Sequence, residues 1–273
     1  MAGSKPIGVF DSGIGGLSVV AEIRKLLPAE SILYYADTLN CPYGPRSSDE
    51  ITRLAIDASS FLIDQGAKLI VVACNTASSV ALTTLRTMFE VPFVGMVPGV
   101  KPATLATRAR KVLVLATEAT VQAEVFSELV DQFAAGIQVH TRACPGLVDL
   151  VEACEIEPGR TEALLREYLE PVQSCGVDAV VLGCTHFVFL RDVIQKLVGD
   201  GVQVIDTGEA VARQVQRVLH EQGIEAGIGS RGALTLMASG GRQRLDAAAE
   251  RLLGLALEPA PPARTKKHLR SSH

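Results

Sequence analysis

Two cysteines in different halves of the chain each follow a run of apolar residues. Cys74 ends the run in VVACNTAS (71–78), and Cys184 ends the run in VVLGCTHF (181–188). We expect each run to be a buried parallel strand that gives way to a helix. The side chain after such a strand lies in the ligand crevice at the carboxyl edge of the sheet. Two thiols that face one crevice could remove a proton from one face of a carbon atom and return a proton to the other face.

A free thiol has a pKa of about 8.5, so only a small fraction is thiolate near neutral pH. A helix N-terminus and a nearby cation can lower this pKa, and we expect helices to start just after both cysteines. The residues that follow the cysteines could bind substrate carboxylates: Asn75, Thr76, Thr185 and His186. A buried cysteine is commonly just a small hydrophobic residue. That interpretation is weaker for this pair, because the same pattern occurs twice, and strong for Cys144, Cys154 and Cys175.

A glycine-rich segment, FDSGIGGLSV (10–19), follows the first expected strand and opens a helix. Its three glycines permit a tight turn and a close approach of the backbone to a ligand. The dinucleotide fingerprint is excluded because Ser18 stands where that pattern needs Gly or Ala. We expect a helix N-terminus with exposed N–H groups that suit a carboxylate. Asp11 could bind a substrate ammonium or assist a thiol; alternatively, Asp11 or Ser12 only caps the helix.

Other polar residues carry weaker signals. His186 lies two residues after Cys184 and could relay a proton or stabilise a thiolate. A C-x-H pair could ligate zinc, but no further ligands at a conventional spacing support a metal site. Glu152, taken alone, is typical of a solvated helix residue, and Asp37 and Tyr43 mark a polar loop at the end of a strand. The sequence shows no P-loop and no G-x-S-x-G motif.

The composition is that of a soluble globular protein. Of the 273 residues, 48% are hydrophobic and 21% charged, which permits a sizeable core in one or two domains. A net charge of −4 and the absence of Trp argue against a nucleic-acid-binding protein. No apolar run approaches the roughly 20 residues of a membrane span, and the N-terminus lacks a secretory pattern. The six cysteines include no C-x-x-C pair, so we expect free thiols in the cytoplasm.

Strand and helix patterns alternate along nearly the whole chain, which is typical of α/β folds with parallel sheets. We expect strands at 7–10, 32–36, 69–73, 93–96, 112–117, 137–141, 178–182, 202–205 and 233–238. We expect helices at 15–27, 49–65 (with Asp49 as its N-cap), from about 76, and at 118–134, 147–153, 160–174, 187–198, 207–221 and 240–254.

This order predicts two α/β domains with the crevice between them. The first is discontinuous, comprising 1–97 plus 208–258, and the second comprises 98–207. The tail at 259–273 is rich in proline, contains four cationic residues and no acid, and is expected to be disordered.

The sequence resembles the glutamate racemases, within the cofactor-independent aspartate/glutamate racemase family. Six motifs carry the resemblance: FDSGIGGLSV (10–19), YADTLNCPYG (35–44), VVACNTAS (71–78), VPGVKPA (97–103), LVE (150–152) and GCTHF (183–187). Together they are specific, although no single one would be. Departures touch the edge of the site: Phe187–Val188 for the usual Tyr-Pro, Ala36 for Gly, Cys41 for a basic residue, and Gly99 for Ala.

The resemblance implies two pseudo-symmetric domains with glutamate bound between them, and a 1,1-proton transfer that uses no cofactor and no metal. Cys74 and Cys184 would be the acid/base residues, Asp11 would assist Cys74, and Glu152 and His186 would assist Cys184. The implied substrate-binding residues are Asp11, Ser12, Tyr43, Gly44, Asn75, Thr76, Thr185 and His186. The resemblance also implies a cytoplasmic enzyme, frequently a homodimer, whose D-glutamate serves peptidoglycan synthesis.

Three alternatives remain open from the sequence. An aspartate racemase would use the same pair of thiols, although the DSGIGG and PYG segments favour glutamate. A Cys–His hydrolase or amidotransferase would use Cys184 as its nucleophile and leave Cys74 dispensable. A binding protein could contact nucleic acid or an acidic partner through the basic tail.

Overall fold

Nine strands form two parallel sheets in the computed structural model, which describes residues 5–254 apart from 155, 157, 228 and 230. The strands are β1 (Ile7–Asp11), β2 (Ile32–Ala36), β3 (Leu69–Val72), β4 (Phe93–Val94), β5 (Lys111–Ala116), β6 (Gln138–Ala143), β7 (Ala179–Leu182), β8 (Gln203–Ile205) and β9 (Leu234–Ala238). The first sheet has the order β4-β3-β1-β2-β9 and the second β6-β5-β7-β8. The predicted basic tail lies outside the described residues.

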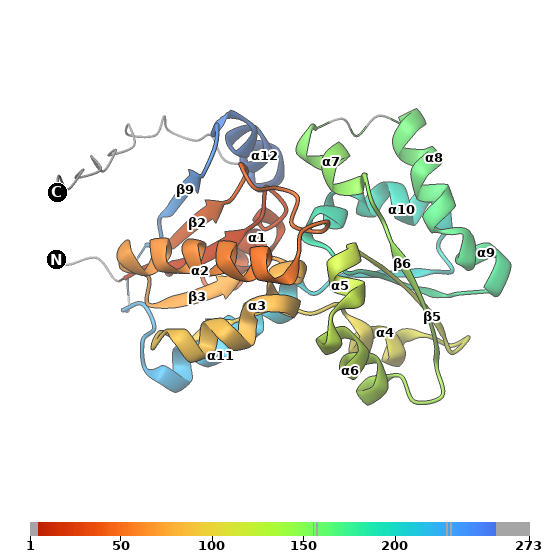
Figure 1. The fold of residues 1–273 in the computed structure, drawn as a ribbon, viewed down its shortest axis with the longest axis horizontal. Helices are drawn as coiled ribbons and strands as arrows, with labels where there is room; N and C mark the ends of the chain where they lie inside the picture. Colours follow the sequence, from red (N-terminus) through yellow and green to blue (C-terminus); the bar gives the residue numbers. More distant parts are fainter. Residues whose placement is uncertain (1–4, 155, 157, 228, 230, 255–273) are drawn as a thin grey trace.

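Helices cover both sheets (Figure 1). They are α1 (Leu17–Leu26), α2 (Ser48–Asp64), α3 (Asn75–Met88), α4 (Val100–Ala106), α5 (Glu118–Gln122), α6 (Glu124–Phe133), α7 (Leu147–Glu152), α8 (Pro158–Tyr168), α9 (Glu170–Cys175), the 3₁₀ helix η1 (Thr185–Leu190), α10 (Arg191–Val198), α11 (Gly208–Gln222) and α12 (Gln243–Leu253). Two parallel sheets flanked by helices confirm the predicted fold class. The strands divide between the sheets as expected, and the exact domain boundaries stay a prediction.

The central strands are buried along their whole length, which explains their uninterrupted apolar sequences. Every residue of β1, β3 and β7 is buried. Val72, the last residue of β3, pairs with Phe10, and Leu182, the last residue of β7, pairs with Leu115. Cys74 and Cys184 therefore lie at equivalent places, two residues beyond a strand in each sheet.

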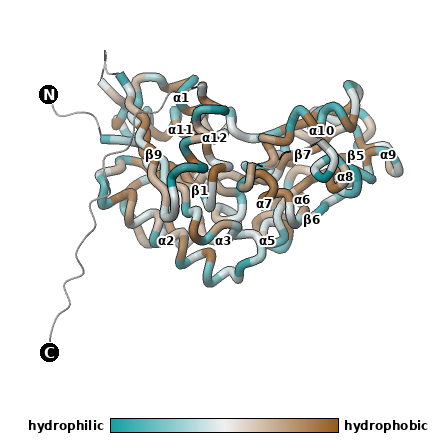
Figure 2. Tube along the Cα trace, turned by 90° about the horizontal axis from the view of Figure 1, so that it is seen from above, coloured by the Kyte–Doolittle hydropathy of each residue, from teal (hydrophilic) through white to brown (hydrophobic). Residues whose placement is uncertain are grey.

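The two halves share a hydrophobic core. One cluster of buried residues contains Val9 from β1, Leu115 from β5 and Leu150 from α7. Seen from above, β1 lies in one half and β7 in the other, with hydrophobic segments around α7 where the halves meet (Figure 2). None of the helices in the described part of the chain is long and apolar enough to cross a membrane.

Several helices differ from the sequence prediction. The expected helix at 118–134 is broken at Ala123, whose backbone is extended, and the one at 160–174 is interrupted at Leu169. The helix expected at 187–198 begins as the 3₁₀ helix η1. Helix α4 was not predicted; Pro102 lies in its first turn, where proline is tolerated because the N–H it lacks would have no partner within the helix.

The N-cap of α2 is Ser47, so the prediction of Asp49 was wrong. The Ser47 hydroxyl accepts a hydrogen bond from the Glu50 N–H at 3.3 Å, and the Glu50 carboxylate accepts one from the Ser47 N–H at 3.3 Å. This reciprocal capping box satisfies two backbone donors that the first turn would otherwise leave free. Asp49 instead places a negative charge in the first turn, where the helix dipole favours it.

We expect Ser47→Ala to lower the free energy of unfolding by about 1 kcal/mol, because the first turn of α2 loses its capping acceptor. Urea unfolding followed by circular dichroism measures this change. The neighbouring exposed Ser48 is the matched control, and Ser48→Ala should change stability by less than about 0.5 kcal/mol. Equal losses in the two variants would contradict the assignment of the cap.

Candidate active site

A narrow cavity lies between the carboxyl edges of the two sheets. Cys74, which follows β3, and Cys184, which follows β7, both line it. The remaining lining residues are Ser12, Pro42, Tyr43, Gly44, Asn75, Thr76, Thr117, Val148, Thr185 and His186. The fold thus brings both predicted thiols, and most of the predicted substrate-binding residues, around one enclosed space.

Asp11, the last residue of β1, is completely buried behind this cavity. Its Oδ1 accepts hydrogen bonds from the Ser12 hydroxyl at 3.0 Å and the Gly13 N–H at 2.9 Å. Its Oδ2 accepts one from the Thr185 hydroxyl, at 2.7 Å, across the crevice. The Ser12 hydroxyl in turn lies 4.0 Å from Cys74 Sγ. Asp11 therefore approaches the thiol through Ser12 and also ties the two halves together.

Cys74 is the N-cap of α3, and its Sγ accepts a hydrogen bond from the Ala77 N–H at 3.5 Å. We expected the helix N-terminus to lower the pKa of this thiol; the Ala77 N–H does so, but the net shift is upward. Burial, reinforced by the charge of Asp11, raises the pKa of Cys74 to about 12 and outweighs the N–H groups of the helix. Cys74 is therefore a protonated thiol near neutral pH.

Cys184 has a different neighbour, an imidazole. His186 Nδ1 lies 3.8 Å from Cys184 Sγ, and His186 Nε2 lies 2.6 Å from Glu152 Oε1. Burial alone would lower the pKa of His186, but contacts with Cys184, Cys41 and Glu152 hold it well above its ordinary value. For Glu152, burial raises the pKa, and the imidazole more than compensates, so the net shift is downward. Glu152 and His186 form an ion pair beside Cys184.

The same Glu152 oxygen also accepts a hydrogen bond from the Ile14 N–H, at 2.7 Å. In the loop between β1 and α1, the Gly13 N–H thus donates a hydrogen bond to Asp11, and the Ile14 N–H donates one to Glu152. The N–H groups of Gly13 and Ile14 are therefore not free to bind a substrate carboxylate, contrary to the expectation for this loop.

The glycines of this loop serve close packing. A Cβ atom at Gly13 would lie 1.9 Å from Glu152 Oε1, and one at Gly15 would lie 2.5 Å from His186 Nδ1 and from Thr185 Oγ1. Gly13 and Gly15 both have ordinary negative φ angles. Absence of a side chain, rather than a left-handed backbone, is what these positions require.

Asn75 presents a polar group to the cavity without an internal partner. Its side-chain Nδ2 and Oδ1 atoms are buried and have no hydrogen-bond partner among the described residues. Buried polar atoms are normally satisfied, so an unpaired amide in a cavity indicates a polar ligand. The neighbouring Thr76 hydroxyl is already engaged with Thr117, at 2.8 Å, and Thr120, at 3.3 Å.

Tyr43 also lines the cavity, and its hydroxyl donates to Asp37 Oδ2 at 2.7 Å. Asp37 accepts two further hydrogen bonds, at 3.0 Å, from the Asn40 amide. Burial and the Asp37 charge raise the pKa of Tyr43, so its phenol stays protonated. Asp37 is therefore the anchor of this loop, a role that its position after β2 did not reveal.

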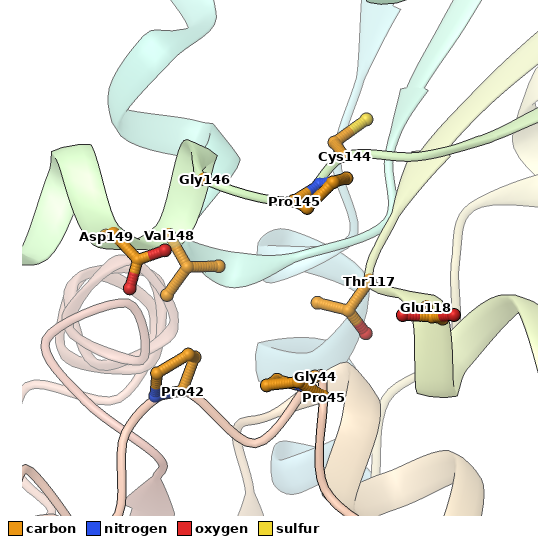
Figure 3. Close-up of a pocket in the computed structure, with 10 residues that line it drawn as sticks. All are labelled: Pro42, Gly44, Pro45, Thr117, Glu118, Cys144, Pro145, Gly146, Val148 and Asp149. Carbon is orange, nitrogen blue, oxygen red and sulfur yellow. The ribbon is translucent and has the colours of Figure 1, made fainter.

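An outer pocket of about 100 Å³ adjoins the cavity (Figure 3). Pro42, Gly44, Thr117 and Val148 line both spaces. Loop residues of the first half and the segment that begins α7 face each other across this pocket (Figure 3). It marks the approach from solvent to the two thiols.

Sequence reasoning missed some residues of the site and misjudged others. Thr117 and Val148 line the cavity. Thr117 follows β5 and Val148 lies in the first turn of α7, and neither segment has a sequence motif that indicates a functional site. Cys144 is buried, as expected of a small hydrophobic residue, whereas Cys154 is exposed and does not fit that interpretation. Glu152 contacts His186 directly, so the interpretation of Glu152, from its local sequence alone, as a solvated helix residue was wrong.

We expect Glu152→Gln to lower the free energy of unfolding by roughly 3 kcal/mol, because it leaves the buried charge of His186 without its partner. Because the pKa of Glu152 is lowered, its contribution to the free energy of unfolding is complete above pH 4.5. That contribution is lost as the pH falls through the lowered pKa. Because the pKa of His186 is raised, its contribution to the free energy of unfolding is complete below pH 6.5. That contribution is lost as the pH rises through the raised pKa. The effect should be largest between these two pH values.

Urea unfolding of the wild type and of Glu152→Gln, over a pH series that extends below 4.5 and above 6.5, checks the prediction. Glu162→Gln is the control, because Glu162 forms a surface pair with Arg166 on α8. That substitution should change stability by less than about 0.5 kcal/mol at every pH. A Glu152→Gln effect that stays constant across the series would contradict the ion pair.

Comparison with known proteins agrees with this geometry. Residues 7–215 match the model of the Asp/Glu/Hydantoin racemase family. The chain is 48% identical over 236 residues to a glutamate racemase of Herpetosiphon aurantiacus, which covers 86% of this chain and 93% of that protein.

Two crystal structures of glutamate racemases are also similar. The RacE1 isoform from Bacillus anthracis superposes with a TM-score of 0.84 at 33% identity, covering 92% of this chain and 94% of that one. The enzyme from Francisella tularensis, solved in complex with D-glutamate, gives a TM-score of 0.80 at 29% identity, with the same coverage of 92% and 94%. The match to the family model, the close relative and the shared architecture together show that this chain belongs to the Asp/Glu/Hydantoin racemase family, a family of isomerases.

Proposed function

We propose that this protein interconverts L- and D-glutamate by moving the α-proton between the thiols of Cys74 and Cys184, without a cofactor. The observation that carries the proposal is the placement of both thiols around one cavity, each two residues beyond a parallel strand of a different sheet. Glutamate is the favoured substrate because the similar proteins are named glutamate racemases, and one of them was solved with D-glutamate.

The proton balance needs one thiolate and one thiol. The thiolate removes the α-proton from one face of the substrate and becomes a thiol. The thiol on the opposite face donates its proton to the carbanion and becomes the thiolate. The α-carbon is inverted, and the two sulfur atoms have exchanged protonation states, so the reverse reaction starts from the product state.

The two thiols have different means of reaching the thiolate form. The raised pKa of Cys74 keeps this thiol protonated near neutral pH. A substrate ammonium bound in the cavity would lower that pKa, because a nearby positive charge favours the thiolate. Beside Cys184, the imidazolium of His186, held by Glu152, supplies a positive charge at 3.8 Å. In this scheme Asp11 and Glu152 are positioning residues, and Ser12, Asn75 and Thr185 bind the substrate.

Stabilising the carbanion falls to fixed polar groups in a cavity that excludes water. The Asn75 side-chain amide has no hydrogen-bond partner among the described residues and can bind the substrate. Asn75 is also the first residue of α3, so the positive end of this helix dipole faces the cavity. Thr117 and Thr120 hold the Thr76 hydroxyl and so fix the first turn of α3.

We expect Cys74→Ser and Cys184→Ser each to lower the rate of racemisation by at least about 10²-fold, because a serine hydroxyl is a far weaker acid than a thiol. Polarimetry of purified protein with L- or D-glutamate, with a chelator and without pyridoxal phosphate, measures this rate. The matched controls are Cys154→Ser and Cys175→Ser, which lie outside the cavity and should retain full activity. Near wild-type rates in both Cys74→Ser and Cys184→Ser would overturn the mechanism.

The same assay with aspartate tests the substrate. Faster turnover of aspartate than of glutamate would indicate that the protein is an aspartate racemase. A trapped acyl-enzyme on Cys184, with Cys74 dispensable, would indicate a hydrolase instead.

The remaining expectations are part of the same proposal. D-Glutamate from this reaction would supply peptidoglycan synthesis in the cytoplasm, and the enzyme would act as a homodimer. Depletion of the protein should then create a requirement for external D-glutamate, and sedimentation equilibrium would give the mass of the assembly.

A further inference from the structure

Three side chains with metal-binding atoms meet at one edge of the cavity. Cys41 comes from the loop after β2, Glu152 ends α7, and His186 lies in η1. The thiol, the carboxylate oxygen and the imidazole nitrogen all lie within 4.8 Å of one another. We call these three residues the Cys–Glu–His cluster. The sequence did not indicate it, because its members come from three separate segments and have no conventional spacing.

The cluster is closed on one side and accessible on another. A Cβ atom at Gly13 would lie 2.9 Å from Cys41 Sγ and 1.9 Å from Glu152 Oε1, so the backbone of the β1–α1 loop packs directly against both groups. His186 is buried, whereas Cys41 and Glu152 are only partly buried. An ion could therefore reach the cluster from the side of Cys41 and Glu152, and the glycine backbone would limit how far the ligands can move apart.

The donor set suits a borderline-soft divalent cation. Thiolate, imidazole and carboxylate are the three ligand types of zinc sites in proteins. Zinc bonds of about 2.0–2.3 Å place tetrahedral ligand atoms roughly 3–4 Å from one another. The three ligand atoms lie within 4.8 Å of one another, so shifts of about 1 Å would bring them to zinc-site separations. His186 Nε2 and Glu152 Oε1, now 2.6 Å apart, would have to move apart by about that much.

The surrounding charges also favour a cation. The Cys41 thiol lies near the negative charges of Glu152 and Asp11, although the imidazole of His186 opposes them. An ion that displaces the thiol proton and the imidazole proton would place its positive charge between these two carboxylates.

We propose that Zn²⁺ binds Cys41 Sγ, a Glu152 carboxylate oxygen and His186 Nε2, and that this binding inhibits the enzyme. Binding releases the thiol proton and one imidazole proton, and leaves a fourth coordination position for water. It removes the ion pair between Glu152 and His186 and fixes the imidazole on the metal. The Nδ1–H stays beside Cys184, but the ring is held on the metal and can no longer exchange its Nε2 proton with Glu152. The inhibitory half of this inference rests on the proposed function, whereas the binding half does not.

Metal-free, full-length protein tests both halves. Zn²⁺ added in the racemisation assay should inhibit, and EDTA should restore the rate. Co²⁺ added to the same protein, without substrate, should give the thiolate-to-cobalt charge-transfer absorption at one equivalent. In Cys41→Ser, measured relative to its own rate without Zn²⁺, the concentration of Zn²⁺ for half inhibition should rise at least about tenfold, and the charge-transfer absorption should be lost.

Cys154→Ser is the matched control, because it removes an exposed thiol that is outside the cluster. It should keep wild-type inhibition by Zn²⁺ and the wild-type cobalt spectrum. Cys41→Ser that remains as sensitive to Zn²⁺ as the wild type would overturn the site, and would point to the thiols of Cys74 and Cys184. No charge-transfer absorption in the wild type would overturn metal binding, whether or not the protein racemises glutamate. Cobalt binding through Cys41 without inhibition by Zn²⁺ in an active enzyme would overturn the inhibitory half alone.

Discussion

One carboxylate oxygen holds the two halves of this site in register. Glu152 Oε1 accepts the Ile14 N–H from the loop after β1 and contacts His186 Nε2 in the segment after β7. Three stretches of chain that are distant in sequence therefore converge on one atom. Gly13 and Gly15 of the first loop lack side chains because this carboxylate, the His186 imidazole and the Thr185 hydroxyl fill the space. The position of the thiols relative to each other depends on this junction.

The two thiols occupy equivalent places in the two sheets, but their surroundings differ in charge. Cys74 lies near the carboxylate of Asp11, which helps to raise the pKa of that thiol. Cys184 lies near an imidazole whose proton is held by Glu152. A racemase must handle two mirror-image substrates, so equivalence of position is useful. The difference in charge means that each direction of proton transfer starts from a different electrostatic state.

The sequence was sufficient for the fold class and for placing Cys74 and Cys184 just beyond buried strands of different sheets, whereas their catalytic role stays a prediction. These features follow from local patterns: apolar runs such as 69–73 and 178–182, each ending near a cysteine. It was insufficient where a residue's role depends on a partner from another segment. Glu152 has the pattern of a surface residue of α7, and only the approach of His186 and Ile14 makes it central. Cys41 belongs to the same class, because Glu152 and His186, which it meets, come from other segments. Asp37 differs, because its partners Asn40 and Tyr43 lie in its own loop, whose path the sequence does not specify.

The order of the strands also bears on how the chain folds as it is synthesised. Strand β9 completes the first sheet beside β2, yet it follows the entire second sheet along the chain. A ribosome therefore releases β1 to β4 long before the strand that covers the outer edge of β2. During this interval β2 presents unpaired N–H and C=O groups, which can pair with another chain and lead to aggregation. Premature termination before residue 234 would make that exposed edge permanent, even though every residue that lines the cavity had already been made.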